Sequence, residues 1–150
     1  MAVTVAPSVE AMRAITDRIN TGGKYCLEVL ATYGEQMIDP LEEITGLRVD
    51  VVSETEEQLN ETLDLEDNTS HVIRIWIRKK LDNVSNEVVD EMKLLVRQIF
   101  QRVNQWRNES GRVQIWEADF DSRRNPDKAV LHQQWLFVSQ ILLRVEVGPS

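Results

Sequence analysis

The side chains able to act as nucleophiles or metal ligands are few and lie far apart in the sequence. Cys26 is the single cysteine, and the two histidines are His71 and His132. A zinc site needs three or four ligands, and no short-spaced motif supplies them. Nucleophilic catalysis needs a hydroxyl or thiol beside a base, and neither GxSxG nor CxxC occurs. Although distant residues can converge in a fold, we interpret Cys26 as a small buried residue, His71 as the start of a strand and His132 as part of a charged arm.

Adjacent carboxylates and glycine-rich loops are two further signals of catalysis or cofactor binding. Glu42-Glu43 and Glu56-Glu57 could divide the roles of general acid and base, but only in a cleft that desolvates one carboxylate. The six glycines form neither GxGxxG nor GxxxxGKS/T, so no phosphate-binding loop is indicated. The sequence therefore predicts a protein that is not an enzyme and that holds no cofactor or metal ion.

Arginine and tryptophan residues mark a candidate surface for protein contacts. Arg74, Trp76 and Arg78 alternate along one face of a predicted strand. Both residue types are enriched in protein interfaces, but the same pattern fits an ordinary half-exposed sheet face. A charged linker or arm at residues 119–132 contains a second basic pair, Arg123 and Arg124.

The spacing of apolar residues predicts the elements that position these side chains. Helical spacing predicts a first helix at residues 8–20, which ends before Gly22-Gly23. It predicts a second helix from a cap at residues 83–85 to about residue 107. Alternation predicts strands at residues 24–33, 47–51, 71–79, 112–117 and 134–147, with one capped helical turn at 39–44. The expected fold class is α+β, a two-layer sandwich in which two helices pack on a mostly antiparallel or mixed sheet of about five strands.

Length and composition favour one globular domain over residues 1–150. Of the 150 residues, 42% are hydrophobic and 28% are charged, which is ordinary globular usage. No apolar run approaches the ~20 residues of a membrane span, and the start of the chain lacks a secretory signal. With one cysteine and no disulfide, we expect the protein to stay in the reducing compartment where it is made, away from membranes.

The balance of charge is acidic, and part of it is concentrated in one segment. Lysine and arginine total 17 against 25 aspartates and glutamates, a net charge of −8 that opposes general binding to nucleic acid. Residues 54–67 contain seven acids and no base, so we expect a long solvated loop there.

Five segments spread over nearly the whole chain carry a family pattern. They are ITDRIN at 15–20, VDVV at 49–52, HVIRIWIRKK at 71–80, the helix from Asn86 with Met92, Leu95 and Ile99, and FVSQILL at 137–143. In their order and pattern, rather than in any short motif, they resemble the tail terminator or tail completion proteins of long-tailed bacteriophages, including the lambda minor tail protein U type.

The resemblance implies a structural protein of the virion. Such proteins form a hexameric ring that caps the completed tail tube, ends its polymerisation and joins it to the neck or head connector. The implied partners are further copies of the chain, the tail tube protein and a neck or head-connector protein. DNA would pass through the lumen of the ring without being bound specifically. The implied location is the tail or neck of the virion, assembled in the cytoplasm of the bacterial host.

Two hypotheses place charged residues in such a ring, without being carried over from the family. A negative lumen would repel DNA phosphates, so Glu54, Glu56, Glu57 and Glu61 are proposed to face the channel or its rim. The arm at residues 119–132, with Arg123 and Arg124, is proposed to reach a neighbouring subunit or the tube.

Other functions stay open on the sequence alone. A head completion or neck protein of the same virion would share the ring and the lack of chemistry. A nonviral adaptor could dimerise through the face that carries Arg74, Trp76 and Arg78. A small enzyme or small-ligand-binding domain would need a pocket assembled from residues distant in sequence.

Overall fold

Two helices and a five-stranded sheet make up the part of the chain that the computed structural model describes. The described residues are 6–34, 46–58, 69–120, 131 and 135–148, with the backbone alone for 55–58. In chain order the elements are α1 (Pro7–Asn20), β1 (Ala31–Gly34), β2 (Leu47–Gln58), β3 (Thr69–Lys80), α2 (Asn86–Val103), β4 (Val113–Phe120) and β5 (Leu136–Val147). The fold class is α+β, which confirms the prediction.

The sheet is mixed and is built around β3. Its strand order is β1-β2-β3-β5-β4, with β1 parallel to β2 and all other neighbours antiparallel. β3 pairs along its whole length with β5, from Thr69 opposite Val147 to Lys80 opposite Leu136. Every second residue of β3 near its middle is an isoleucine, a β-branched residue that suits a pleated and buried surface.

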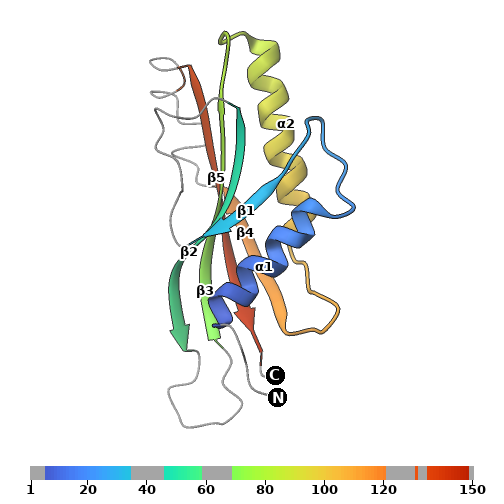
Figure 1. Cartoon of the computed structure of the whole chain (residues 1–150), viewed down its shortest axis with the longest axis vertical. Helices are drawn as coiled ribbons and strands as arrows, with labels where there is room; N and C mark the ends of the chain where they lie inside the picture. The colour runs from blue at the N-terminus through green and yellow to red at the C-terminus, as the bar shows by residue number, and fades with distance from the viewer. Residues whose placement is uncertain (1–5, 35–45, 59–68, 121–130, 132–134, 149–150) are drawn as a thin grey trace.

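Both helices cover the same face of the sheet (Figure 1). Ile73, Ile75 and Ile77 of β3 are fully buried and form the centre of that face. The helices contribute their apolar stripes to the same core: Met12, Ile15 and Ile19 from α1, and Met92, Leu95 and Ile99 from α2. Each such side chain contributes roughly 1.5–3 kcal/mol when fully buried, so the sheet and helices are held together mainly by this core.

The ends of α2 are set by local hydrogen bonds. Ser85 caps the first turn, because its hydroxyl accepts a bond of 3.3 Å from the amide of Val88. At the other end the helix stops at Val103 instead of the predicted residue 107. The backbone of Asn104 is extended and Gln105 has a φ of 55°, so the helical hydrogen-bond pattern ends there.

The first predicted strand is much shorter than expected. Only Ala31–Gly34 joins the sheet, and the prediction of a strand from residue 24 is wrong. Tyr25, Leu27 and Val29 still pack against the core at alternate positions, which accounts for the strand-like pattern. The amide of Cys26 donates to Oε1 of Gln98 at 2.8 Å, so a side chain of α2 replaces a neighbouring strand as its partner.

Two segments predicted to be irregular belong partly to strands. The acidic segment begins inside β2, so the predicted loop is wrong over this part. Residues 54–58 continue that strand, and residues 55–58 pair with β3. Asp119 and Phe120, assigned to the charged arm, instead end β4. The helical turn at 39–44, the rest of the acidic segment at 59–67 and most of the arm lie outside the described residues. No helix in the described part of the chain is both long and apolar enough to cross a membrane.

Replacing the cap of α2 tests the role of Ser85. Ser85→Ala removes the acceptor for the Val88 amide and should lower the free energy of unfolding by about 1 kcal/mol. Ser85→Asp keeps an acceptor at the same position and should retain most of the stability. Urea unfolding followed by circular dichroism measures both. Equal losses in the two variants would contradict the capping role.

Candidate protein-interaction surface

The predicted contact residues of β3 lie on the face of the sheet away from the helices. Arg74, Trp76 and Arg78 alternate with the buried isoleucines and therefore point to the other side. In the sheet register Arg78 lies between Arg48 of β2 and Val138 of β5, and Trp76 lies between Asp50 and Gln140.

Arg78 forms a buried ion pair instead of an exposed contact. Its side chain is 0% exposed, and its Nη2 lies 2.7 Å from Oδ2 of Asp50, whose side chain is 4% exposed. Oδ1 of the same carboxylate accepts a bond of 3.0 Å from the hydroxyl of Thr32 and lies 3.5 Å from Nη2 of Arg48. A desolvated guanidinium needs this compensation, because an uncompensated buried charge costs several kcal/mol.

The prediction that Arg78 contacts a partner is therefore corrected. Its burial distinguishes it from Arg74 and Trp76, the other two predicted contact residues of β3. Because Arg78 is fully buried, it is not available to a partner on this surface. Arg74 is partly exposed, donates to Oε1 of Gln140 at 2.8 Å and pairs with Glu54. Trp76 is half-buried and packs on Leu136 and Val138.

The other predicted contact residues and channel acids are only partly described. Glu54 lies at the surface beside Arg74, so its charge is locally paired. Glu56 lies opposite His71 in the sheet register, and Glu57 lies opposite Ser70. Glu61, Arg123 and Arg124 lie outside the described residues, and so do Glu42, Glu43 and His132.

The residues that could support chemistry are not brought together in the described part of the chain. His71 is buried in β3, with its Nε2 2.7 Å from the hydroxyl of Thr69. Cys26 is exposed, so the prediction of a buried thiol is wrong. Partial desolvation against α2 and the nearby Glu91 carboxylate raise the pKa of the Cys26 thiol. No three His, Cys, Asp or Glu side chains among the described residues could share a metal ion.

An exposed aromatic edge of the sheet was not anticipated from the sequence. β4 is the outer strand at one side of the sheet. The segment after α2 covers only the first half of β4: the amide of Ile115 donates to the carbonyl of Trp106, and the amide of Asn108 donates to the carbonyl of Val113. Trp116 is 56% exposed and donates to Glu146, whereas Phe120 is 37% exposed. Among the described residues, the second half of β4 has no strand on its outer side.

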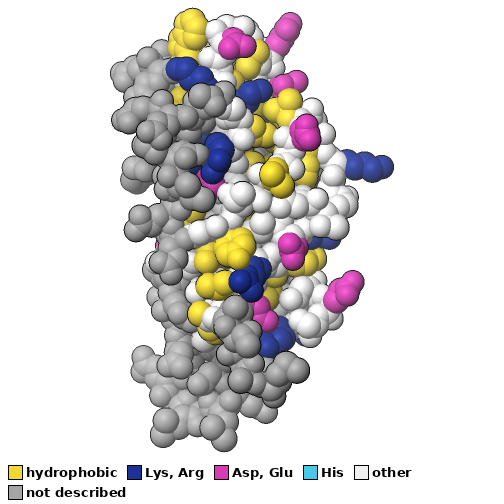
Figure 2. Space-filling view, viewed as in Figure 1, with side chains coloured by type: hydrophobic (Ala, Val, Ile, Leu, Met, Phe, Trp, Pro, Cys, Tyr) yellow, Lys and Arg dark blue, Asp and Glu magenta, His cyan; other side chains and the backbone are white. Residues whose placement is uncertain are grey.

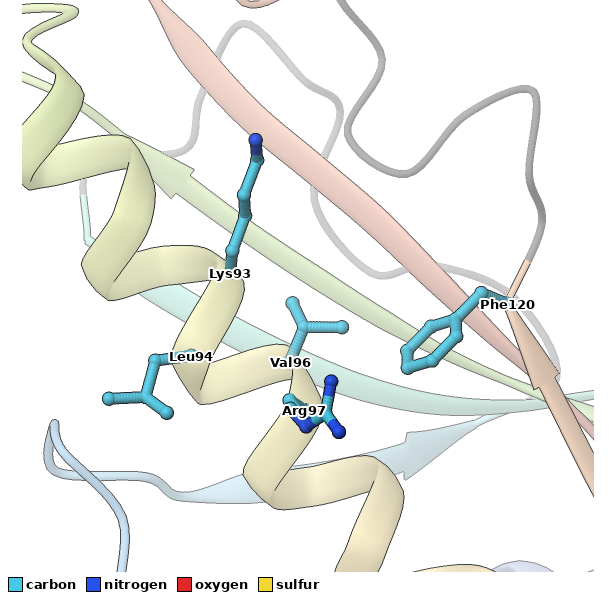
Figure 3. A pocket seen from close by; sticks show the side chains of 5 residues that line it. All are labelled: Lys93, Leu94, Val96, Arg97 and Phe120. Carbon is cyan, nitrogen blue, oxygen red and sulfur yellow. The ribbon is translucent and has the colours of Figure 1, made fainter.

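A groove lies between this edge and α2 (Figure 3). The groove has a volume of about 420 Å³. Its lining residues are Lys93, Leu94, Val96 and Arg97 of α2 and Phe120 of β4. Phe120 projects from β4 toward the helix and stacks on Phe100, with ring centroids 4.4 Å apart. Lys93 and Arg97 are exposed and form no ion pair with any described residue. The groove thus combines the aromatic ring of Phe120 with two cations that pair with no described carboxylate.

The β4 edge and the groove beside it expose aromatic and cationic side chains. Figure 2 shows apolar side chains exposed among charged ones on the face that it displays. Exposed aromatic residues beside an open sheet edge allow both side-chain packing and backbone pairing with another chain. A scan of the sequence against protein-family models and a search of curated proteins found no match.

A double-mutant cycle tests the buried ion pair. Asp50→Asn leaves the Arg78 charge buried without its carboxylate and should cost about 3–5 kcal/mol of unfolding free energy. Adding Arg78→Met removes the buried charge that has lost its partner. The loss of unfolding free energy in the double variant should therefore be at least ~1 kcal/mol smaller than the sum of the losses in the two single variants. Urea denaturation supplies the free energies. Strict additivity would contradict the direct pairing of the two side chains.

Alkylation of the single cysteine tests the environment of Cys26. Because its pKa is raised, less thiolate is present at a given pH, and only the thiolate reacts rapidly with iodoacetamide. The midpoint of the rate against pH should therefore be higher in the native chain than in the urea-unfolded chain. Glu91→Gln should lower the native midpoint. Mass spectrometry follows the reaction, and a native midpoint at or below the unfolded one would oppose this account.

Proposed function

We propose that this chain is the subunit of a ring that caps a bacteriophage tail tube, ends its polymerisation and joins it to the neck. The proposal rests on the family resemblance of five segments along the chain. The observation in the fold that best supports it is the open aromatic edge of β4 beside the basic groove. A role of this kind requires docking and no turnover of a substrate.

A closed ring requires two different patches on each subunit that fit each other. The second half of β4 can supply one of these patches. No described strand pairs with this half on its outer side, so a segment from a neighbouring copy could pair with its backbone, with Trp116 and Phe120 beside it for packing. Lys93 and Arg97 then offer charge to the acidic surface of the neighbour. The partly exposed Arg74 and Trp76 remain candidates for a further contact, with the tube or the connector.

The acidity of the chain is compatible with DNA passing through the ring. A net charge of −8 on each copy disfavours lasting contact between phosphates and the lumen wall. Glu54 is a weaker candidate for this role than the sequence suggested, because Arg74 compensates its charge. A ring structure that places the acids of residues 54–67 on its outer wall would exclude their role in the lumen.

Assembly with the tube protein of the same genome tests the proposal. Native mass spectrometry of the purified chain should show a hexamer, or a monomer that becomes a ring only on tubes. Electron microscopy of tubes grown with the chain should show capped ends and a limited length. A chain that neither binds tubes nor limits their growth would refute the proposed function.

Two matched tryptophan variants localise the contact. Trp116→Glu places a charge on the β4 edge and should reduce ring formation or capping at least tenfold, because aromatic anchors carry much of the binding energy in interfaces. Trp135→Glu is the control. Trp135 is 48% exposed and lies about 30 Å away along β5, so assembly should be unchanged. Equal effects in both variants would exclude β4 as the contact.

A further inference from the structure

A second pocket, separate from the groove at β4, lies where the two helices end. It has a volume of about 740 Å³ and is formed by the C-terminal half of α1 with Thr21, the last turn of α2 and residues 106–110. Its ionisable lining residues are three arginines, Arg18, Arg102 and Arg107, and two acids, Asp17 and Glu109. The lining therefore carries a net charge of +1, in a chain whose total is −8.

Two of these arginines are held in place by each other's backbone. Nε of Arg18 donates to the carbonyl of Arg102 at 2.9 Å, and Nε of Arg102 donates to the carbonyl of Arg18 at 3.1 Å. Nη2 of Arg102 also donates to the carbonyl of Thr21. The guanidinium of Arg18 lies over the ring of Trp106, with Cζ 5.4 Å from the ring centre. The two side chains are thus oriented before any ligand arrives.

Capping of the helix ends explains part of this arrangement but leaves charge uncompensated. Cations are favourable at helix C-termini, and the bonds to backbone carbonyls fit that role. Neither Arg18, Arg102 nor Arg107 has a carboxylate within ion-pair distance among the described residues. Desolvation and the neighbouring positive charge of Arg102 lower the pKa of Arg18, and two like charges held this close repel each other. An anion between them would relieve that repulsion.

We infer that this pocket binds a carboxylate side chain from an acidic segment of a partner protein. The remaining N–H groups of Arg18 and Arg102 can donate to carboxylate oxygens in charge-assisted hydrogen bonds. Trp106 and Ala14 give the pocket apolar contact area for the chain that carries the carboxylate. A single negative charge matches the lining, whereas Asp17, Glu109 and the total charge of −8 oppose a nucleic-acid backbone. The inference does not depend on ring formation.

Titration with a blocked tetraglutamate peptide, followed by nitrogen–proton NMR, tests this site. The chain has four tryptophans, and the indole resonance of Trp106, assigned from Trp106→Phe, should shift saturably. A blocked tetraglutamine peptide should produce no saturable shift. Saturable binding of tetraglutamine with similar affinity, or no response to tetraglutamate, would overturn the inference. Tighter binding of an oligothymidylate at the same resonance would overturn it in favour of a phosphate site.

Three arginine variants separate binding from folding. Arg18→Gln removes one oriented guanidinium and should weaken tetraglutamate binding roughly tenfold or more. Arg107→Gln, at the exposed rim, leaves the reciprocal bonds of the helix ends intact and should also weaken binding. Arg13→Gln is the control, because Arg13 lies on α1 outside the pocket and donates to the hydroxyl of Tyr33. This variant should bind tetraglutamate as tightly as the unchanged protein does. If Arg107→Gln binds normally, or Arg13→Gln loses affinity equally, the assignment of the pocket fails.

Discussion

The pairing of β3 along its whole length, with β2 on one side and β5 on the other, is the constraint on which the rest of the fold depends. Because side chains alternate along a strand, the burial of Ile73, Ile75 and Ile77 under the helices fixes the register of both neighbours. A slip of one residue would turn these isoleucines away from the helices. The same register sends Arg74, Trp76 and Arg78 to the opposite face, so the core on one side determines the polar arrangement on the other.

The ion pair of Asp50 and Arg78 follows from that register. Asp50 lies opposite Trp76, two positions from Arg78 along β3, so the pair is a diagonal one across neighbouring strands. Its geometry would not survive a shift between β2 and β3. We therefore interpret the pair as a device that specifies the register, a role that buried polar groups can have even where their net stability is small.

The sequence predicted the parts of the fold that depend on local pattern. The two amphipathic helices, the Ser85 cap and the alternation of β3 and β5 are all local signals. Tertiary pairing decided the rest: the acids of residues 54–58 read as a loop but extend β2, because cross-strand partners override a weak intrinsic preference. Alternation likewise indicated the face of Arg78 but not its burial. The pocket of Arg18 and Arg102 joins residues 84 positions apart, a contact that no local pattern reveals.

The net charge of −8 restricts how copies of this chain could meet. Acidic surfaces repel each other, so a stable contact must bring a local excess of positive charge against an acidic neighbour. The groove with Lys93 and Arg97 supplies such an excess at one place. A twofold contact through this groove would place the two cationic grooves against each other, whereas a head-to-tail contact would place each groove against a different and acidic patch. If copies of this chain assemble through the groove, electrostatics therefore favours a heterologous contact, as the proposed ring requires.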